Sequence, residues 1–103
     1  MTALDSIEMH DALIIRMDIK YAEKVVSIDV ELYTQSDRRV REKRSIVFDG
    51  VRSISQISDL NAIGKNAFAG NINYWVPGKD GSTTFIYLTD GCIAIEAQTV
   101  RVE

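Results

Sequence analysis

Alternation of apolar and polar residues constrains this chain more than any other feature. Apolar residues occupy every second position in two consecutive runs, 12–20 and 26–33. They are Leu13, Ile15, Met17 and Ile19 in the first run, and Val26, Ile28, Val30 and Leu32 in the second. Successive side chains of a strand point to opposite faces, so both runs predict half-buried strands. The short polar link 21–24 between them favours a β-hairpin.

The rest of the chain continues as short β-rich runs separated by turn signals. Asp49-Gly50, the segment 77–81 and the segment 89–91 are the turn signals. The runs that we expect to be strands are 45–48, 51–57, 71–76, 83–88, 92–96 and 98–103. The segment from Asp59 to Phe68 differs, because its apolar residues fall near helical spacing after a capping candidate, Ser58 or Asp59.

These patterns predict a mainly β fold in a single domain, residues 1–103. We expect an antiparallel β sandwich or small barrel of about seven or eight strands, with one short helical segment at Asp59–Phe68. The predicted core comprises Leu13, Ile15, Met17, Ile19, Val26, Ile28, Val30, Leu32, Phe48, Ile72, Tyr74, Phe85, Tyr87, Ile93 and Ile95.

Charge and cysteine content narrow the function classes. The formal net charge is −3, which argues against nucleic acid as a partner. The one cysteine, Cys92, excludes an intrachain disulfide and lies in an apolar strand context, so we expect a small buried residue. Residues 1–11 lack the pattern of a signal peptide, and no apolar run approaches the ~20 residues of a membrane span. We therefore expect a cytoplasmic protein without membrane association.

His10-Asp11 is the first candidate for chemistry, because a histidine beside a carboxylate can serve as a general base. Adjacent strand residues, however, point to opposite faces, and the chain holds no second histidine. We expect a structural pair at the start of the first strand, with His10 buried and hydrogen-bonded to backbone.

A basic segment is the second candidate. It contains Arg38, Arg39, Arg41, Lys43 and Arg44. Such a cluster could contact phosphates or an acidic partner. The alternative is a solvated strand edge on which positive charges discourage unwanted pairing. The segment contains no aromatic residues for base stacking, which favours the edge interpretation.

The third candidate is the segment that contains Asn71, Asn73, Tyr74 and Trp75. Asparagine can make specific polar contacts, and aromatic side chains add contact area at binding surfaces. The alternative is a tight turn at Gly70-Asn71 followed by an aromatic residue that covers the core.

Motifs of catalysis and of cofactor binding are absent from the sequence. It contains no Gly-x-Ser-x-Gly elbow, no phosphate-binding glycine loop and no ligand set for zinc or calcium. We therefore predict no catalytic residue, no metal and no cofactor.

Three short motifs resemble those of small uncharacterised bacterial β-rich proteins, including immunity-like domains. They are His10-Asp11-Ala12, Phe48-Asp49-Gly50-Val51 and Ala69-Gly70-Asn71-Ile72. The resemblance implies a cytoplasmic bacterial β domain and assigns no catalytic residue.

The leading functional prediction is a non-catalytic module that binds another protein or itself, so a homo-oligomer is one expected form. One alternative is an immunity-like inhibitor whose acidic face blocks a basic toxin. Another is a small-ligand-binding protein or enzyme that uses His10 as acid or base.

Overall fold

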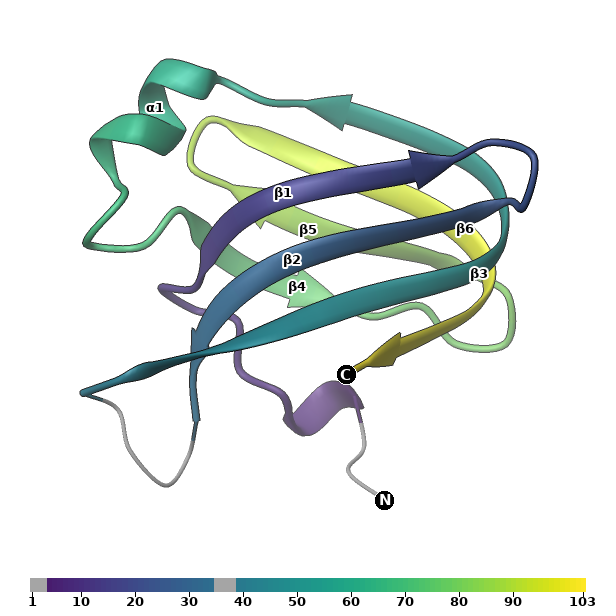
Figure 1. Cartoon of the computed structure of the whole chain (residues 1–103), viewed down its shortest axis with the longest axis horizontal. Helices are drawn as coiled ribbons and strands as arrows, with labels where there is room; N and C mark the ends of the chain where they lie inside the picture. Colours follow the sequence, from purple (N-terminus) through teal and green to yellow (C-terminus); the bar gives the residue numbers. More distant parts are fainter. Residues whose placement is uncertain (1–3, 35–38) are drawn as a thin grey trace.

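The computed structural model describes residues 4–34 and 39–103, and within them the chain forms one antiparallel sheet of six strands (Figure 1). The strand order is β1-β2-β3-β6-β5-β4. The strands are β1 (Leu13–Lys20), β2 (Val25–Tyr33), β3 (Arg41–Ile57), β4 (Ile72–Val76), β5 (Thr83–Leu88) and β6 (Gly91–Val102), and the helices are the 3-10 turn η1 (Leu4–Ser6) and α1 (Leu60–Lys65). The prediction of a mainly antiparallel β fold with one short α-helix is confirmed.

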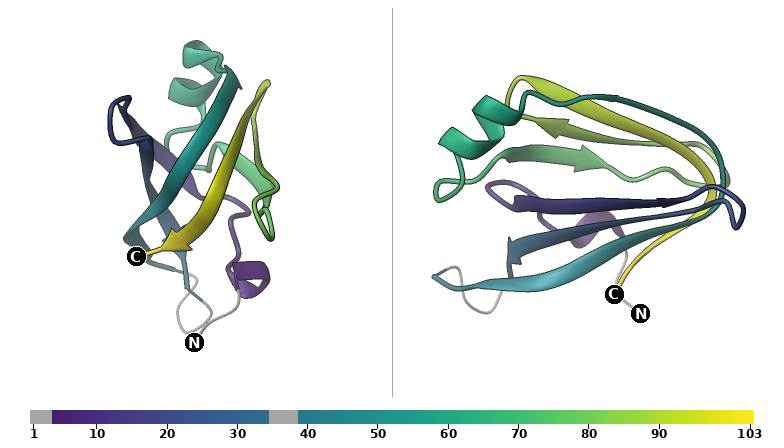
Figure 2. Two further views of the ribbon diagram at one scale, coloured as in Figure 1. Left: turned by 90° about the vertical axis from the view of Figure 1, so that its right-hand side faces the viewer. Right: turned by 45° about the horizontal axis from the view of Figure 1, so that its top comes forward.

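Two long bent strands fold the sheet into two layers, which Figure 2 shows edge-on. Residues 41–49 of β3 pair with β2, whereas residues 51–57 pair only with β6. The bend lies at Gly50, whose φ is 62°, beside a register shift between Val51 and Ser53. The first layer comprises β1, β2, the first part of β3 and the end of β6, whose residues 99–102 pair with residues 46–49 of β3. The second layer comprises the last part of β3, the rest of β6, β5 and β4.

This bend explains why the described residues form six strands rather than seven or eight. Asp49-Gly50 is not a chain reversal, because the predicted runs 45–48 and 51–57 are consecutive parts of β3. The runs 92–96 and 98–103 likewise merge into β6. A left-handed glycine allows a strand to bend as readily as it allows a turn.

The core lies between the layers. Among the predicted core residues, those that are fully buried are Val26, Ile28, Val30, Leu32, Phe48, Ile72, Ile93 and Ile95. Met17 and Ile19 are partly buried against this core, and Leu13 and Tyr87 are half-buried.

The prediction was wrong for Ile15, Tyr74 and Phe85, which are exposed. A register shift between Ile14 and Arg16 turns Ile15 outward, and another after Ile72 turns Tyr74 outward. At such an irregularity the alternation changes phase, so residues before it and residues after it do not follow one period of two.

In β5 the residues that face the core alternate in the opposite phase to the one predicted. Thr84, Ile86 and Leu88 point inward, so Phe85 and Tyr87 lie on the outer face. Helix α1 ends earlier than Phe68, and its N-cap Asp59 accepts a hydrogen bond from the backbone N–H of Ala62 at 3.0 Å.

The two openings between the layers differ. At one end, an isolated bridge between Ala12 and Ile72 joins the start of β1 to β4, but the sheet does not close into a barrel. The N-terminal segment fills one opening, because Ile7 and Met9 pack into the core and the indole N–H of Trp75 donates to the carbonyl of Ile7 at 3.0 Å.

Candidate functional site

His10 and Asp11 lie at the surface beside the first residues of β4. The Nδ1 atom of His10 is 3.0 Å from the carbonyl oxygen of Asn73, and its Nε2 atom is 3.4 Å from the carboxylate of Asp11. The expected backbone partner is therefore present, but the expected burial is wrong, since the His10 side chain is 67% exposed. Neither side chain lines the two pockets described below. An exposed pair of this kind stabilises a fold only weakly.

Asn71 is the polar centre of the same region, and both polar atoms of its side chain make structural hydrogen bonds. The residue is 2% exposed. Its Oδ1 atom accepts a hydrogen bond from the backbone N–H of Ile14 at 2.8 Å, and its Nδ2 atom donates to the carbonyl of Ile63 at 3.3 Å. Its backbone N–H donates to Ala12, and its carbonyl accepts from Thr89. Asn71 thus joins β1, α1 and the β5–β6 turn.

Gly70 allows this junction to form. Its φ is 117°, and a Cβ atom there would lie 2.5 Å from backbone atoms of Asp11. The segments 10–12 and 69–72 are therefore packed against each other, with Ala12 bridged to Ile72. Two of the three motifs behind the bacterial resemblance form this junction, and the third contains the bend at Gly50. Their residues are accounted for by the fold.

The basic segment is dispersed rather than gathered into one patch. The Arg41 guanidinium donates to the carbonyl of Asp11 at 3.1 and 3.2 Å and to that of Phe68 at 2.8 Å. It also lies over the Tyr33 ring, 4.6 Å from the centroid. Arg41 therefore fastens β3 to the junction, which is a structural role.

The other basic residues take different positions. Arg44 is on the inner side of β3 and forms an ion pair with Glu42 at 2.5 Å. Lys43 is exposed on the opposite face, and Arg39 precedes the strand. Arg38 lies outside the described residues. Alternation along β3 places Arg44 on the face opposite Lys43, so the described basic residues of the segment are divided between two faces.

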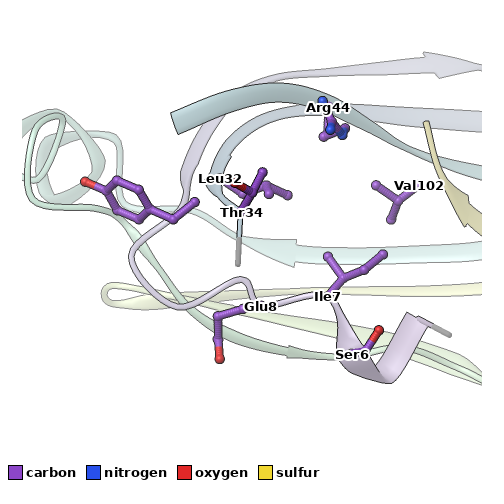
Figure 3. Close-up of a pocket in the computed structure, with 8 residues that line it drawn as sticks. Ser6, Ile7, Glu8, Leu32, Thr34, Arg44 and Val102 are labelled. Atoms are coloured by element: carbon purple, nitrogen blue, oxygen red, sulfur yellow. The ribbon is translucent and has the colours of Figure 1, made fainter. Parts of the chain in front are cut away.

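One pocket of about 420 Å³ opens where the N-terminal segment meets β2, β3 and β6 (Figure 3). Ile7 and Val102 line it together with Arg44 and Glu8. Arg44 is paired with Glu42, and the Glu8 carboxylate accepts the backbone N–H of His10 at 2.8 Å. Both charged groups of this pocket therefore already have partners within the chain.

The outer faces of the two layers contrast sharply. On the first layer, charged side chains pair across strands. Arg16 lies 3.7 Å from the Asp29 carboxylate, the Ser45 hydroxyl donates to Asp29 at 2.7 Å, and Arg101 pairs with Asp49. Interleaved opposite charges are typical of a solvated sheet face.

The outer face of the second layer is apolar. Cross-strand neighbours share a face, and the register places Tyr74 beside Tyr87, Tyr87 beside Cys92 and Cys92 beside Ile57. The next row runs from Val76 through Phe85 and Ala94 to Ser55. We call the apolar members of these rows the aromatic face: Ile57, Tyr74, Val76, Phe85, Tyr87, Cys92 and Ala94.

Three rings stack at the centre of the aromatic face. The ring centroids of Tyr74 and Tyr87 are 4.5 Å apart, and those of Phe85 and Tyr87 are 6.1 Å apart. Ile57 is 73% exposed and Tyr74 is 51% exposed. Burial, assisted by the neighbouring Tyr74 and Cys92, raises the pKa of Tyr87 above its ordinary value. The rings are therefore ordered against one another while much of their surface faces solvent.

Sequence reasoning assigned the aromatic face poorly. Tyr74 was a candidate binding residue, but Trp75 is buried in the core, and Phe85 and Tyr87 were assigned to the core. One signal was present: β5 is apolar at both phases, with Phe85 and Tyr87 interleaved with Ile86 and Leu88. Such a run is typical of a strand that is covered on both faces.

Among residues 4–34 and 39–103, no group of three His, Cys, Asp or Glu side chains is arranged to hold a metal ion. In the same part of the chain, none of the helices is long and apolar enough to cross a membrane. Comparison with known protein families and with curated proteins finds no match to this sequence.

Proposed function

We propose that this chain is a non-catalytic protein-interaction module that self-associates through its aromatic face. The observation that carries this proposal is the contrast between the two outer faces of one sheet. The first layer presents paired charges, whereas the central two rows of the second layer contain no charged residue. Contiguous exposed apolar patches on a folded domain mark interaction sites, and tyrosine and phenylalanine are enriched there.

The charges around the aromatic face do not oppose a second copy as the partner. The chain carries a net charge of −3, so two copies repel wherever their acidic groups meet. At the aromatic face no like charges oppose each other. The nearest ion pair, Arg52 with Glu96 at 3.2 Å, lies one row beyond the rings and is internally neutral. Two copies can therefore approach face to face without charge repulsion.

The size of the face sets the strength of association. Four strands about 4.8 Å apart and two rows of outward residues cover on the order of 300 Å². A stable interface buries about 800 Å² per partner, so the face supports only a weak dimer. Burial of about 600 Å² in total contributes roughly 15 kcal/mol, and association costs about 4–15 kcal/mol. We expect a dissociation constant in the micromolar to millimolar range.

Sedimentation velocity over a concentration series tests the proposal with a matched pair of variants. Ile57 on the aromatic face and Ile15 on the charged face are both exposed isoleucines in strands, 73% and 52% exposed. Ile57→Glu places a charge inside the dimer interface and should abolish the dimer. Ile15→Glu should leave it unchanged.

Two results would contradict the proposal. The wild-type chain could remain a monomer up to millimolar concentration, or Ile57→Glu and Ile15→Glu could weaken association equally. Circular dichroism of both variants establishes that they keep the β fold, so a lost dimer is not mistaken for a lost domain.

A further inference from the structure

A second groove lies on the side of the molecule where β1 and the last part of β3 form the free edges of the two layers. Its volume is about 540 Å³. The apolar floor is formed by Ile19, Val26, Val51 and Ile54. Val26 is fully buried, and the other three pack against the core with part of their surface accessible. The groove therefore opens directly onto the hydrophobic core.

The opposite opening shows what kind of chain fits between these layers. The N-terminal segment fills it, with Ile7 and Met9 inserted at alternate positions into the core. The indole N–H of Trp75 holds its backbone through the carbonyl of Ile7. Within residues 4–34 and 39–103, no segment takes the equivalent place in the groove beside β3. An extended segment with apolar side chains at every second position would fill this groove as the N-terminal segment fills the opposite opening.

The backbone beside the groove is ready to pair with such a segment. From Arg52 to Ile57, β3 pairs with β6 on one side and with no described strand on the other. The last contact on that side is the backbone hydrogen bond from Val51 to Lys24 at 2.9 Å. A free strand edge next to a row of apolar side chains is the arrangement by which a peptide adds to a sheet.

The charge around the groove selects an acidic occupant. Lys20, Lys24 and Arg52 line it, and no aspartate or glutamate does, although the chain as a whole is acidic. Arg52 is paired with Glu96. Among the described residues, the ammonium groups of Lys20 and Lys24 form no ion pair. Two unpaired cations at one end of an apolar groove complement a carboxylate.

We propose that this groove binds an extended acidic segment of another protein by strand addition to β3. Its alternate apolar side chains contact Ile19 and Ile54, and its carboxylate lies between Lys20 and Lys24. None of the residues that line the groove belongs to the aromatic face, although both sites use β3 and Ile57 lies at the end of the edge that the peptide would pair with.

Selection from a random-peptide phage library on the immobilised chain tests this inference. We expect enriched peptides with apolar residues at every second position and an Asp or Glu at one end. Fluorescence anisotropy of a selected, labelled peptide then measures affinity. The double variant Lys20→Glu, Lys24→Glu should bind about tenfold or more weakly. The controls Lys43→Glu, on the charged face, and Tyr74→Glu, on the aromatic face, should bind as the wild type does.

Other outcomes overturn the inference. If no peptide is enriched, or if the selected peptides lack the acidic and alternating pattern, the groove is not a peptide site. If Tyr74→Glu abolishes binding and the lysine variant does not, the peptides bind the aromatic face. If the wild-type dimer is lost in the lysine variant and kept in Ile57→Glu, a second copy fills the groove instead. Loss of self-association through the aromatic face would leave the peptide result intact.

Discussion

Replacement of Asn71 by alanine should destabilise the domain more than any other single polar substitution at the junction. The amide is buried, accepts from the Ile14 N–H at 2.8 Å and donates to the Ile63 carbonyl at 3.3 Å. Asn71→Ala leaves both backbone groups without a partner in a site that water enters poorly. Each unsatisfied group costs about 1–3 kcal/mol, so we expect a loss of about 2–4 kcal/mol in the free energy of unfolding.

Urea denaturation followed by tryptophan fluorescence measures this loss, because Trp75 is the one tryptophan and is buried. With a slope of roughly 1–3 kcal/mol/M, the midpoint should fall by about 1–2 M. Asn73→Ala is the matched control. Its amide donates to the Leu88 carbonyl at 3.4 Å from a more exposed position, so the loss should stay below about 1 kcal/mol.

The result that would refute this reasoning is an Asn71→Ala variant within about 0.5 kcal/mol of the wild type. An Asn73→Ala variant that is more destabilised than Asn71→Ala would refute it equally. Either result would mean that the junction does not depend on the buried amide.

Three further predictions concern stability. Gly70→Ala should cost more than about 2 kcal/mol in thermal unfolding, because it meets backbone at 2.5 Å, whereas Gly81→Ala, with open space around it, should cost about 1 kcal/mol. Arg41→Met removes hydrogen bonds to two carbonyls and should cost about 1–2 kcal/mol in urea, while Lys43→Met should be nearly neutral. The pKa of Tyr87 is raised above 10.0, so the unfolded chain ionises first and stability should fall as the pH rises past 10.0. Tyr87→Phe should reduce that fall in urea titrations at alkaline pH, and an unchanged slope would contradict it.

The parts of the fold that were predictable are those where pattern and pairing agree. In β2, Val26, Ile28 and Val30 are buried as the alternation indicates, because the strand runs without a bulge between two neighbours. The N-cap Asp59 was likewise recognisable, since its side chain satisfies a backbone N–H of the first helical turn.

Elsewhere the sequence leaves two arrangements equally reasonable. When a strand is apolar on both faces, its sequence does not specify which face packs against the core. In β5, Ile86 and Leu88 face the core, and Phe85 and Tyr87 face outward. The register shifts in β1 and β4 occur in their pairing with β2 and β5, and the apolar pattern of the sequence gives no signal for them. Asp49-Gly50 carries the same local signal for a hairpin turn and for a bent strand.

The candidate site was predictable only in part. His10 with Asp11 and Asn71 with Asn73 were two separate candidates in the sequence, and the structure brings them together at the junction of β1 and β4. The contacts among these residues stabilise the packing of β1 against β4. The aromatic face was missed because its members come from four strands, and only the register places Ile57 beside Cys92 and Tyr87.

Amide chemical shifts measured while the isotope-labelled chain is diluted test the central claim most directly, because they locate the association surface residue by residue. The account predicts shifts that change with concentration at the aromatic face, centred on Tyr74, Phe85 and Tyr87. Amides of the charged face around Asp29 should stay constant. Shifts that change around Asp29 instead, or a spectrum that does not change with concentration, would contradict self-association through the aromatic face.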